Sequence, residues 1–221
     1  MSEVLEELIA NAKSLVESGL VTGAGGNVSA RDGEGMWISP SGFSFEDASP
    51  EDYPLVHIES GEILQGERRP SSEVLMHLAI FRARPMINAI IHTHPKMTIA
   101  LTSAGHDLKA MYADYHVYLG WNVPHIDYVT VTTPQLADAV DEPFRADDCV
   151  GMVLRNHGAI TVGSSIKEAM FRTAAIEEQA FIQWHALQVG TPSFLSDEEK
   201  KKLDDLGSED YRRMLLAKMK G

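Results

Sequence analysis

Cysteine is nearly absent from this chain: Cys149 is the single thiol among 221 residues. One thiol excludes an internal disulfide, and this fits a reducing compartment. The apolar residue Val150 follows it in the sequence. Because unpaired cysteine behaves as a small hydrophobe, this predicts a buried side chain without a nucleophilic role.

Long apolar runs are also missing. No stretch of the sequence approaches the ~20 consecutive apolar residues that a membrane-spanning helix needs. The first residues, Met1-Ser2-Glu3, are polar and acidic and do not follow the pattern of a secretory signal. Together these absences predict a cytoplasmic protein without a membrane partner.

Basic residues are few relative to acidic ones. The chain has 19 lysines and arginines against 32 aspartates and glutamates, so its formal net charge is -13. Nucleic acids and anionic membrane surfaces both attract basic faces, and the charge argues against either as a partner. A small anionic substrate would therefore need nearby groups that attract it, such as backbone amides or a metal ion.

The sequence shows no linker, repeat or low-complexity tract, and this predicts one domain, residues 1–221. Hydrophobic periodicity predicts that helices and strands alternate loosely along it. Helix starts are predicted at Ser71 or Ser72, at Thr133-Pro134 and at a capping box that begins with Ser196. The other predicted helices span 5–16, 95–101 and 165–187, and the predicted strands span 27–31, 36–39, 55–58, 87–94, 150–154 and 159–162. This order favours an α/β fold with a mixed sheet covered by helices.

Two histidines end one of the predicted strands. His92 and His94 follow the apolar run 87–91, and residues two apart on a strand point to the same face. His157 stands at a second junction, between the strands 150–154 and 159–162. Three neutral imidazoles with an open fourth position commonly hold catalytic zinc. The alternative is that these are surface or core histidines, and the surrounding motifs favour the metal.

Three turns offer the groups that bind phosphate. They are Gly25-Gly26-Asn27, Pro40-Ser41-Gly42 and Pro70-Ser71-Ser72-Glu73. Each combines backbone N–H groups with a small side-chain donor. Glu73 also opens a predicted helix, where the helix dipole favours a carboxylate. It is therefore either a helix-start residue or a general base held near the metal.

These motifs resemble those of the class II aldolase/adducin family, and most closely its L-fuculose-1-phosphate aldolases. The resemblance runs from about residue 20 to residue 165. It is carried by Gly25-Gly26-Asn27-Val28-Ser29, Ile38-Ser39-Pro40-Ser41-Gly42, Pro70-Ser71-Ser72-Glu73, His92-Thr93-His94-Pro95 and Asn156-His157-Gly158. It implies a mixed, largely antiparallel central sheet flanked by helices, usually built into a four-fold homotetramer.

The resemblance also implies roles for particular residues. It places a divalent metal, typically Zn²⁺ or otherwise an ion such as Mn²⁺ or Co²⁺, on His92, His94 and His157. Glu73 matches the acid/base carboxylate of the aldolases, whereas related epimerases carry aspartate there, so Glu73 favours a lyase. The phosphate of a small-molecule substrate is assigned to Asn27, Ser41, Gly42, Ser71 and Ser72.

The aldolases of this family place a tyrosine acid in the loop after the His-x-His strand. Here the segment 111–118 offers Tyr112, Tyr115 and Tyr118, of which Tyr112 is the candidate catalytic residue. Ordinary loop packing is the alternative for all three. His116 in the same segment could be an additional metal or substrate contact.

Three functions follow from the resemblance. The first is a metal-dependent lyase, an aldolase that cleaves a small phosphorylated ketose through a metal-stabilised enediolate. The second is a decarboxylase of a sugar-acid phosphate or of another keto or aromatic acid. The third is a non-catalytic binding domain like that of adducin, which would be expected to lose metal ligands. All three histidines and Glu73 are present, and this favours an enzyme.

Overall fold

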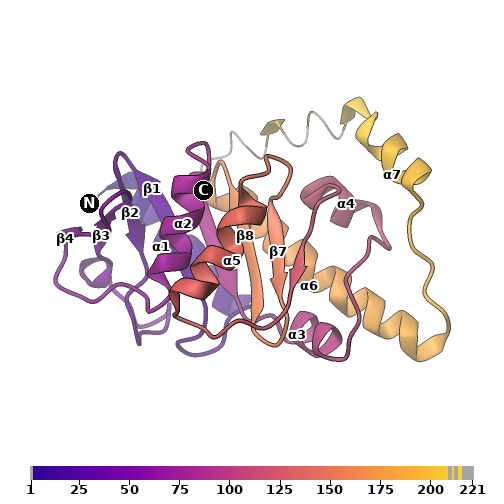
Figure 1. Ribbon diagram of the computed structural model, residues 1–221, viewed down its shortest axis with the longest axis horizontal. Helices are drawn as coiled ribbons and strands as arrows, with labels where there is room; N and C mark the ends of the chain where they lie inside the picture. The colour runs from indigo at the N-terminus through magenta and orange to yellow at the C-terminus, as the bar shows by residue number, and fades with distance from the viewer. Residues whose placement is uncertain (1, 209–210, 212–213, 216–221) are drawn as a thin grey trace.

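The computed structural model describes residues 2–208, 211 and 214–215 (Figure 1). The strands are β1 (Asn27–Asp32), β2 (Gly35–Ile38), β3 (Leu55–His57), β4 (Ile63–Gln65), β5 (Ala89–Thr93), β6 (His125–Ile126), β7 (Gly151–Leu154) and β8 (Gly158–Gly163). The helices are α1 (Glu3–Glu17), α2 (Val74–Ala83), α3 (Lys96–Ser103), α4 (Ala113–Leu119), α5 (Pro134–Phe144), α6 (Ile166–Val189) and α7 (Asp197–Asp204), with a short 3-10 helix at Pro50–Asp52.

The strands form one mixed sheet, in the order β4-β3-β2-β1-β5-β8-β7-β6 among the described residues. The β6–β7 pair is parallel, and the other pairs are antiparallel. This confirms the predicted α/β fold with a largely antiparallel sheet. Strand β5 lies between β1 and β8, so the strand that leads to the predicted metal ligands is central.

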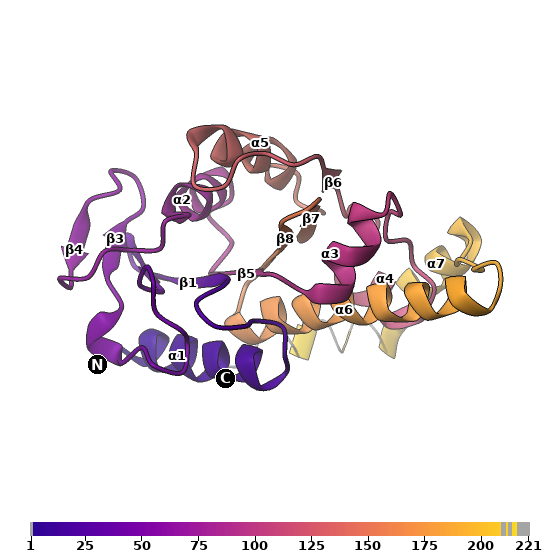
Figure 2. The same cartoon turned by 90° about the horizontal axis from the view of Figure 1, so that it is seen from below.

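Helices cover both faces of the sheet. Figure 2 shows α2 and α5 on one side and α1 and α6 on the other. Ile90 belongs to the core beneath α2 and α5, whereas its neighbour Ile91 belongs to the core beneath α1. Because successive strand residues face opposite sides, the apolar residues 89–91 of β5 supply both cores, and His92 lies on the α2 side with Ile90.

Most predicted helix starts agree with the structure. Thr133 accepts a hydrogen bond from the backbone N–H of Leu136, and Ser196 forms the predicted capping box with Glu199. The prediction for α2 was wrong, because its N-cap residue is Glu73 and not Ser71 or Ser72. The hydroxyl of Ser71 instead accepts the backbone N–H of Glu73, 3.3 Å away. The two serines thus remain in the turn that precedes the helix.

The segment 111–118 is not simply a loop, because α4 begins at Ala113. This helix has only seven residues, too few for stability in isolation, and it depends on packing against α6 and α7. Sequence periodicity therefore gave little signal. The strands β4 and β6 were missed for a related reason, since β4 is exposed throughout and β6 has only two residues, so neither displays an alternation of buried and exposed positions.

Two further expectations concern burial. The side chain of Cys149 is fully buried, and burial raises the pKa of its thiol to about 12, so the thiol is protonated at neutral pH. This agrees with the predicted packing role. Among the described helices, none combines the length and the apolar character that a membrane crossing requires.

Candidate metal centre and anion pocket

Two strand ends bring the three predicted histidines together. His92 lies in β5 and His94 follows the end of that strand, while His157 lies in the turn between β7 and β8. Strand β8 pairs with β5 so that Ala159 is opposite Thr93. Gly158 makes this approach possible, because a Cβ atom at that position would lie 2.2 Å from the carbonyl oxygen of Thr93. The β7–β8 turn therefore places His157 directly beside the end of β5.

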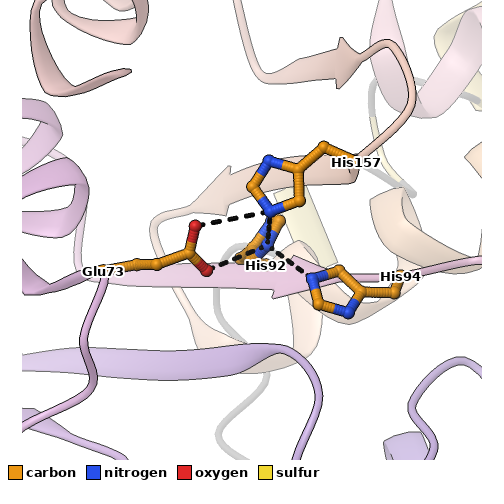
Figure 3. Close-up of side chains that lie close together, drawn as sticks. All are labelled: Glu73, His92, His94 and His157. Atoms are coloured by element: carbon orange, nitrogen blue, oxygen red, sulfur yellow. Dashed lines mark hydrogen bonds and ion pairs between the residues drawn. The ribbon is translucent and has the colours of Figure 1, made fainter. Parts of the chain in front are cut away.

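The ring nitrogens of the three histidines converge. The Nε2 atom of His92 lies 3.1 Å from Nε2 of His94 and 3.2 Å from Nε2 of His157 (Figure 3). The carboxylate of Glu73 completes the group, with Oε2 3.2 Å from His92 Nε2 and Oε1 3.3 Å from His157 Nε2. Four ligand atoms, one from each residue, all lie within 4.8 Å of one another.

This spacing fits a divalent cation. Two nitrogens at the usual 2.0–2.1 Å from a tetrahedral zinc ion are separated by about 3.3 Å, close to the separations from His92 to its two neighbours. The Nδ1 atom of His92 faces the carbonyl oxygen of Ala159 at 3.0 Å. Since a carbonyl only accepts hydrogen bonds, neutral His92 carries its lone pair on Nε2, which points into the cluster.

Electrostatics also favour a cation between these groups. Burial, together with the nearby His92, lowers the pKa of both His94 and His157 to about 4, so both are neutral at pH 7. Burial alone would raise the pKa of Glu73, but its hydrogen bond and Coulombic interaction with His92, its Coulombic interaction with His157 and its hydrogen bond from Asn27 more than offset burial and lower that pKa. Its Oε1 atom is buried without a hydrogen-bond partner among the described residues. The cluster thus brings several electron-pair donors close together, an arrangement that a cation between them would stabilise.

A cavity of about 240 Å³ opens beside the cluster. All five residues predicted to bind phosphate line it, together with Glu73, His94 and His157. The lining is made of Ala24, Gly25, Gly26, Asn27, Pro40, Ser41, Gly42, Ser71, Ser72, Glu73, His94, Val131, Thr132 and His157. The three turns selected from the sequence therefore meet at one pocket, next to the histidines.

Backbone contacts hold these turns in place. The N–H of Ser71 donates to the carbonyl of Ser39, and the N–H of Ser41 donates to the carbonyl of Arg69. Gly26 has a positive φ of 69°, and a Cβ atom there would lie 2.7 Å from the carbonyl oxygen of His92. Glycine at this position allows the first turn to pack directly against the end of β5.

Sequence reasoning missed several residues in or behind this pocket, among them Val131, Thr132 and His77. Val131 and Thr132 form part of its wall, and Thr132 has a positive φ of 65°, which is strained for a β-branched residue. His77 lies behind the pocket, fully buried, and its ring bonds to Asn27 and Ser29. Its spacing of four residues from Glu73 on one helix was the available signal.

The tyrosines of the segment 111–118 lie elsewhere. The hydroxyl of Tyr112 donates to Glu178 on α6 at 2.9 Å, and Tyr115 is buried beneath the same helix. His116 faces Asp204 of α7, with 3.0 Å between its Nε2 atom and Oδ1. None of these residues, nor Tyr118, lines the described pocket. The role of Tyr112 as an acid therefore stays a prediction.

Comparison with known proteins gives a consistent result. Residues 6–184 match the family model described as "Class II Aldolase and Adducin N-terminal domain". A "5-deoxy-D-ribulose 1-phosphate aldolase" from Bacillus thuringiensis serovar kurstaki is 38% identical over 201 residues, which cover 90% of this chain and 92% of that protein. An "L-fuculose phosphate aldolase" from Methanococcus maripaludis is 32% identical over 182 residues, which cover 81% of this chain and 96% of that protein.

Solved structures show the same likeness. One called "L-fuculose 1-phosphate aldolase" superposes with a TM-score of 0.86 and 32% identity, covering 96% of this chain and 97% of its own. The L-fuculose-1-phosphate aldolase from Thermus thermophilus gives a TM-score of 0.74 and 28% identity, covering 88% of this chain and 100% of its own. The fold and the sequence therefore point to one family.

Proposed function

The chain belongs to the class II aldolase and adducin family, and from this premise we propose that it is a metal-dependent aldolase acting on a small phosphorylated ketose. The observation that carries the proposal is the cluster of Glu73 and three histidines, which borders directly on a pocket lined by hydroxyl and glycine turns. A binding domain without catalysis would have no need of four inward-facing donors. The proposal extends to the substrate class, a ketose 1-phosphate, on which several relatives are named to act.

His92, His94 and His157 would hold the divalent ion, and we propose zinc because imidazole nitrogen suits it. When bound, the ion supplies a Lewis acid that polarises the ketone of the substrate. The ring of His92 is held in place by the Ala159 carbonyl. Such an outer partner fixes the tautomer of a ligating histidine and strengthens its binding.

Glu73 is the proposed acid/base. Aldol cleavage of a ketose 1-phosphate breaks the bond between carbons 3 and 4, leaving the electron pair on carbon 3 and an aldehyde at carbon 4. Carbon 4 loses its hydroxyl proton and carbon 3 gains one, so protons balance. In cleavage an ionised Glu73 would take up the hydroxyl proton of carbon 4 and deliver it to carbon 3, and in the synthetic direction it would move a proton the opposite way. Its lowered pKa fits the ionised form at neutral pH.

The phosphate would bind at the turns that carry Ser41, Gly42, Ser71 and Ser72, with Asn27 at their edge. Small donors at close range must outweigh the net charge of -13. This is physically reasonable, because charges on the distant surface are screened beyond ~8 Å at physiological salt. Anchoring the phosphate there would hold the reacting carbons beside Glu73 and the histidines.

Inorganic phosphate is expected to inhibit competitively against the ketose phosphate. Ser71→Ala or Asn27→Ala should raise the inhibition constant by at least about tenfold, since a hydrogen bond to a charged group contributes roughly 1.5–3 kcal/mol. Ser193→Ala, in an exposed loop outside the pocket, serves as the matched control and should leave the constant unchanged. If phosphate does not compete at all, the turns do not form a phosphate site.

The proposed activity is tested by incubating the metal-loaded protein with 5-deoxy-D-ribulose 1-phosphate, L-fuculose 1-phosphate and the corresponding sugars without phosphate. Only the phosphorylated ketoses are expected to be cleaved, each to dihydroxyacetone phosphate and an aldehyde. Loading separate samples with Zn²⁺, Mn²⁺ and Co²⁺ identifies the effective metal. Release of carbon dioxide from a keto acid, without ketose cleavage, would contradict the aldolase proposal and support the decarboxylase.

We further propose that the protein is a homotetramer in the cytoplasm. Support comes from the family resemblance and from the single, buried cysteine. Light scattering during gel filtration should then give about four times the chain mass of 24.3 kDa. A mass of one or two chains would contradict the tetramer.

A further inference from the structure

A chain of side-chain hydrogen bonds runs from the sheet to the proposed acid/base. Ser29 Oγ on β1 lies 2.6 Å from Nδ1 of His77, and His77 Nε2 lies 2.5 Å from Oδ1 of Asn27. The Nδ2 atom of Asn27 then donates to Oε2 of Glu73 at 2.9 Å. These four residues come from β1, from α2 and from the residue that caps α2, and they share the face of the sheet that α2 covers.

The carboxylate of Glu73 determines which group donates in each hydrogen bond of this network. A carboxylate only accepts, so Asn27 must turn its amide NH₂ toward Glu73 and its carbonyl oxygen toward His77. That carbonyl also only accepts, so His77 must carry a proton on Nε2. In the neutral ring, Nδ1 is then unprotonated and accepts the hydroxyl of Ser29. Burial lowers the pKa of His77 to about 3, which agrees with a neutral ring.

We infer that His77 is a positioning residue for Glu73: by donating to Asn27, it fixes the amide so that Asn27 holds Oε2 and leaves Oε1 to exchange protons with substrate. The inference rests on the proposed function, because it assumes that Glu73 is the acid/base. Oε1 accepts no hydrogen bond from the described residues, and it lies 3.3 Å from Nε2 of His157 in the cluster. This hydrogen-bond network does not conduct protons, since the side-chain amide of Asn27 separates His77 from Glu73.

The location of His77 argues against a purely structural role. Its side chain is fully buried, and its neighbours Met76 and Leu78 belong to the hydrophobic core. Placing an imidazole in such surroundings costs free energy that an apolar side chain of similar size would avoid. The ring's described bonds go to Asn27 and Ser29, so its polar atoms serve the network that ends at Glu73.

Two substitutions at His77 separate positioning from packing. Methionine and glutamine are unbranched and similar in length, but only glutamine offers an N–H near the position of Nε2. His77→Met is expected to lower kcat about 10- to 100-fold, the usual scale for an outer partner of a catalytic group, with little change in KM. His77→Gln should recover most of kcat. Equal losses in the two variants, or an unchanged kcat in His77→Met, would overturn the inference.

A double-mutant cycle tests whether His77 acts through Asn27. If it does, His77→Met added to Asn27→Ala should lower kcat less than twofold further, because the path is already broken. A full additional loss would show that His77 acts independently and would overturn the inference. Ketose cleavage by the wild-type protein in the same assay tests the proposed function itself, whereas the cycle tests only the role of His77.

Nuclear magnetic resonance gives a readout that needs no activity. Nitrogen-15 spectra of the histidine side chains should show His77 as the neutral tautomer protonated on Nε2, with no titration between pH 5 and pH 9. The assignment comes from the signal that disappears in His77→Gln. A ring protonated on Nδ1, or charged in this range, would overturn the inference even if the protein proved not to be an aldolase.

Discussion

Alanine at His92, His94 or His157 is expected to remove tightly bound divalent metal. Loss of an outer partner of a metal ligand already costs 10–100-fold in affinity, so loss of a ligand should exceed about 100-fold. Metal content would be measured by mass spectrometry of the elements after dialysis, and affinity by competition with a chromogenic chelator. Both readouts report the site directly and do not depend on knowing the substrate.

His92→Ala should have the largest effect of the three. Its Nε2 atom lies within 3.2 Å of the Nε2 atoms of both other histidines, and its ring is fixed by the Ala159 carbonyl. His157, by contrast, has a buried Nδ1 atom without a partner among the described residues. His106→Ala is the matched control, because His106 is exposed and does not line the pocket. Full retention of metal in all three variants would refute the site.

Local sequence rules predicted that two of the four clustered residues, His92 and His94, would lie side by side. His92 and His94 share a face because residues two apart on a strand must do so. That His157 joins them depends on the register between β5 and β8, in which Ala159 pairs with Thr93. Register is a long-range property set by core packing and turn geometry, and the sequence does not display it. The sequence selected His157 only by its position at a second strand junction, and the family resemblance supported grouping it with the other two histidines.

His77 shows why other parts of the site escaped prediction. In the sequence it stands among apolar residues of a predicted helix, where a histidine is expected to be part of the core. Its hydrogen bonds join it to Ser29 and Asn27, which are 48 and 50 positions away in the sequence, so no local pattern displays them. The helix α4 was missed for a similar reason, because its seven residues are held by contacts with α6 and α7 and not by their own propensity.

Glu73→Gln is expected to lower turnover about 100-fold or more, the usual contribution of a general acid or base. Glutamine keeps the size of the side chain, and its carbonyl oxygen can still accept from the Asn27 amide, so the pocket should keep its shape. Metal content should change little. Three histidines remain, and catalytic zinc commonly has three protein ligands with an open fourth position.

A second readout distinguishes proton transfer from other roles of the carboxylate. Wild-type protein should exchange one carbon-bound hydrogen of dihydroxyacetone phosphate with D₂O in the absence of aldehyde, because a base takes that proton in the synthetic direction. Glu73→Gln should slow the exchange by a factor similar to its loss of turnover. If Glu73 were only a helix-start residue, the variant would instead exchange normally and melt at a lower temperature, since a carboxylate at the N-terminus of α2 interacts favourably with the helix dipole. If it were an essential ligand, metal would be lost together with exchange, so the three roles predict three different patterns.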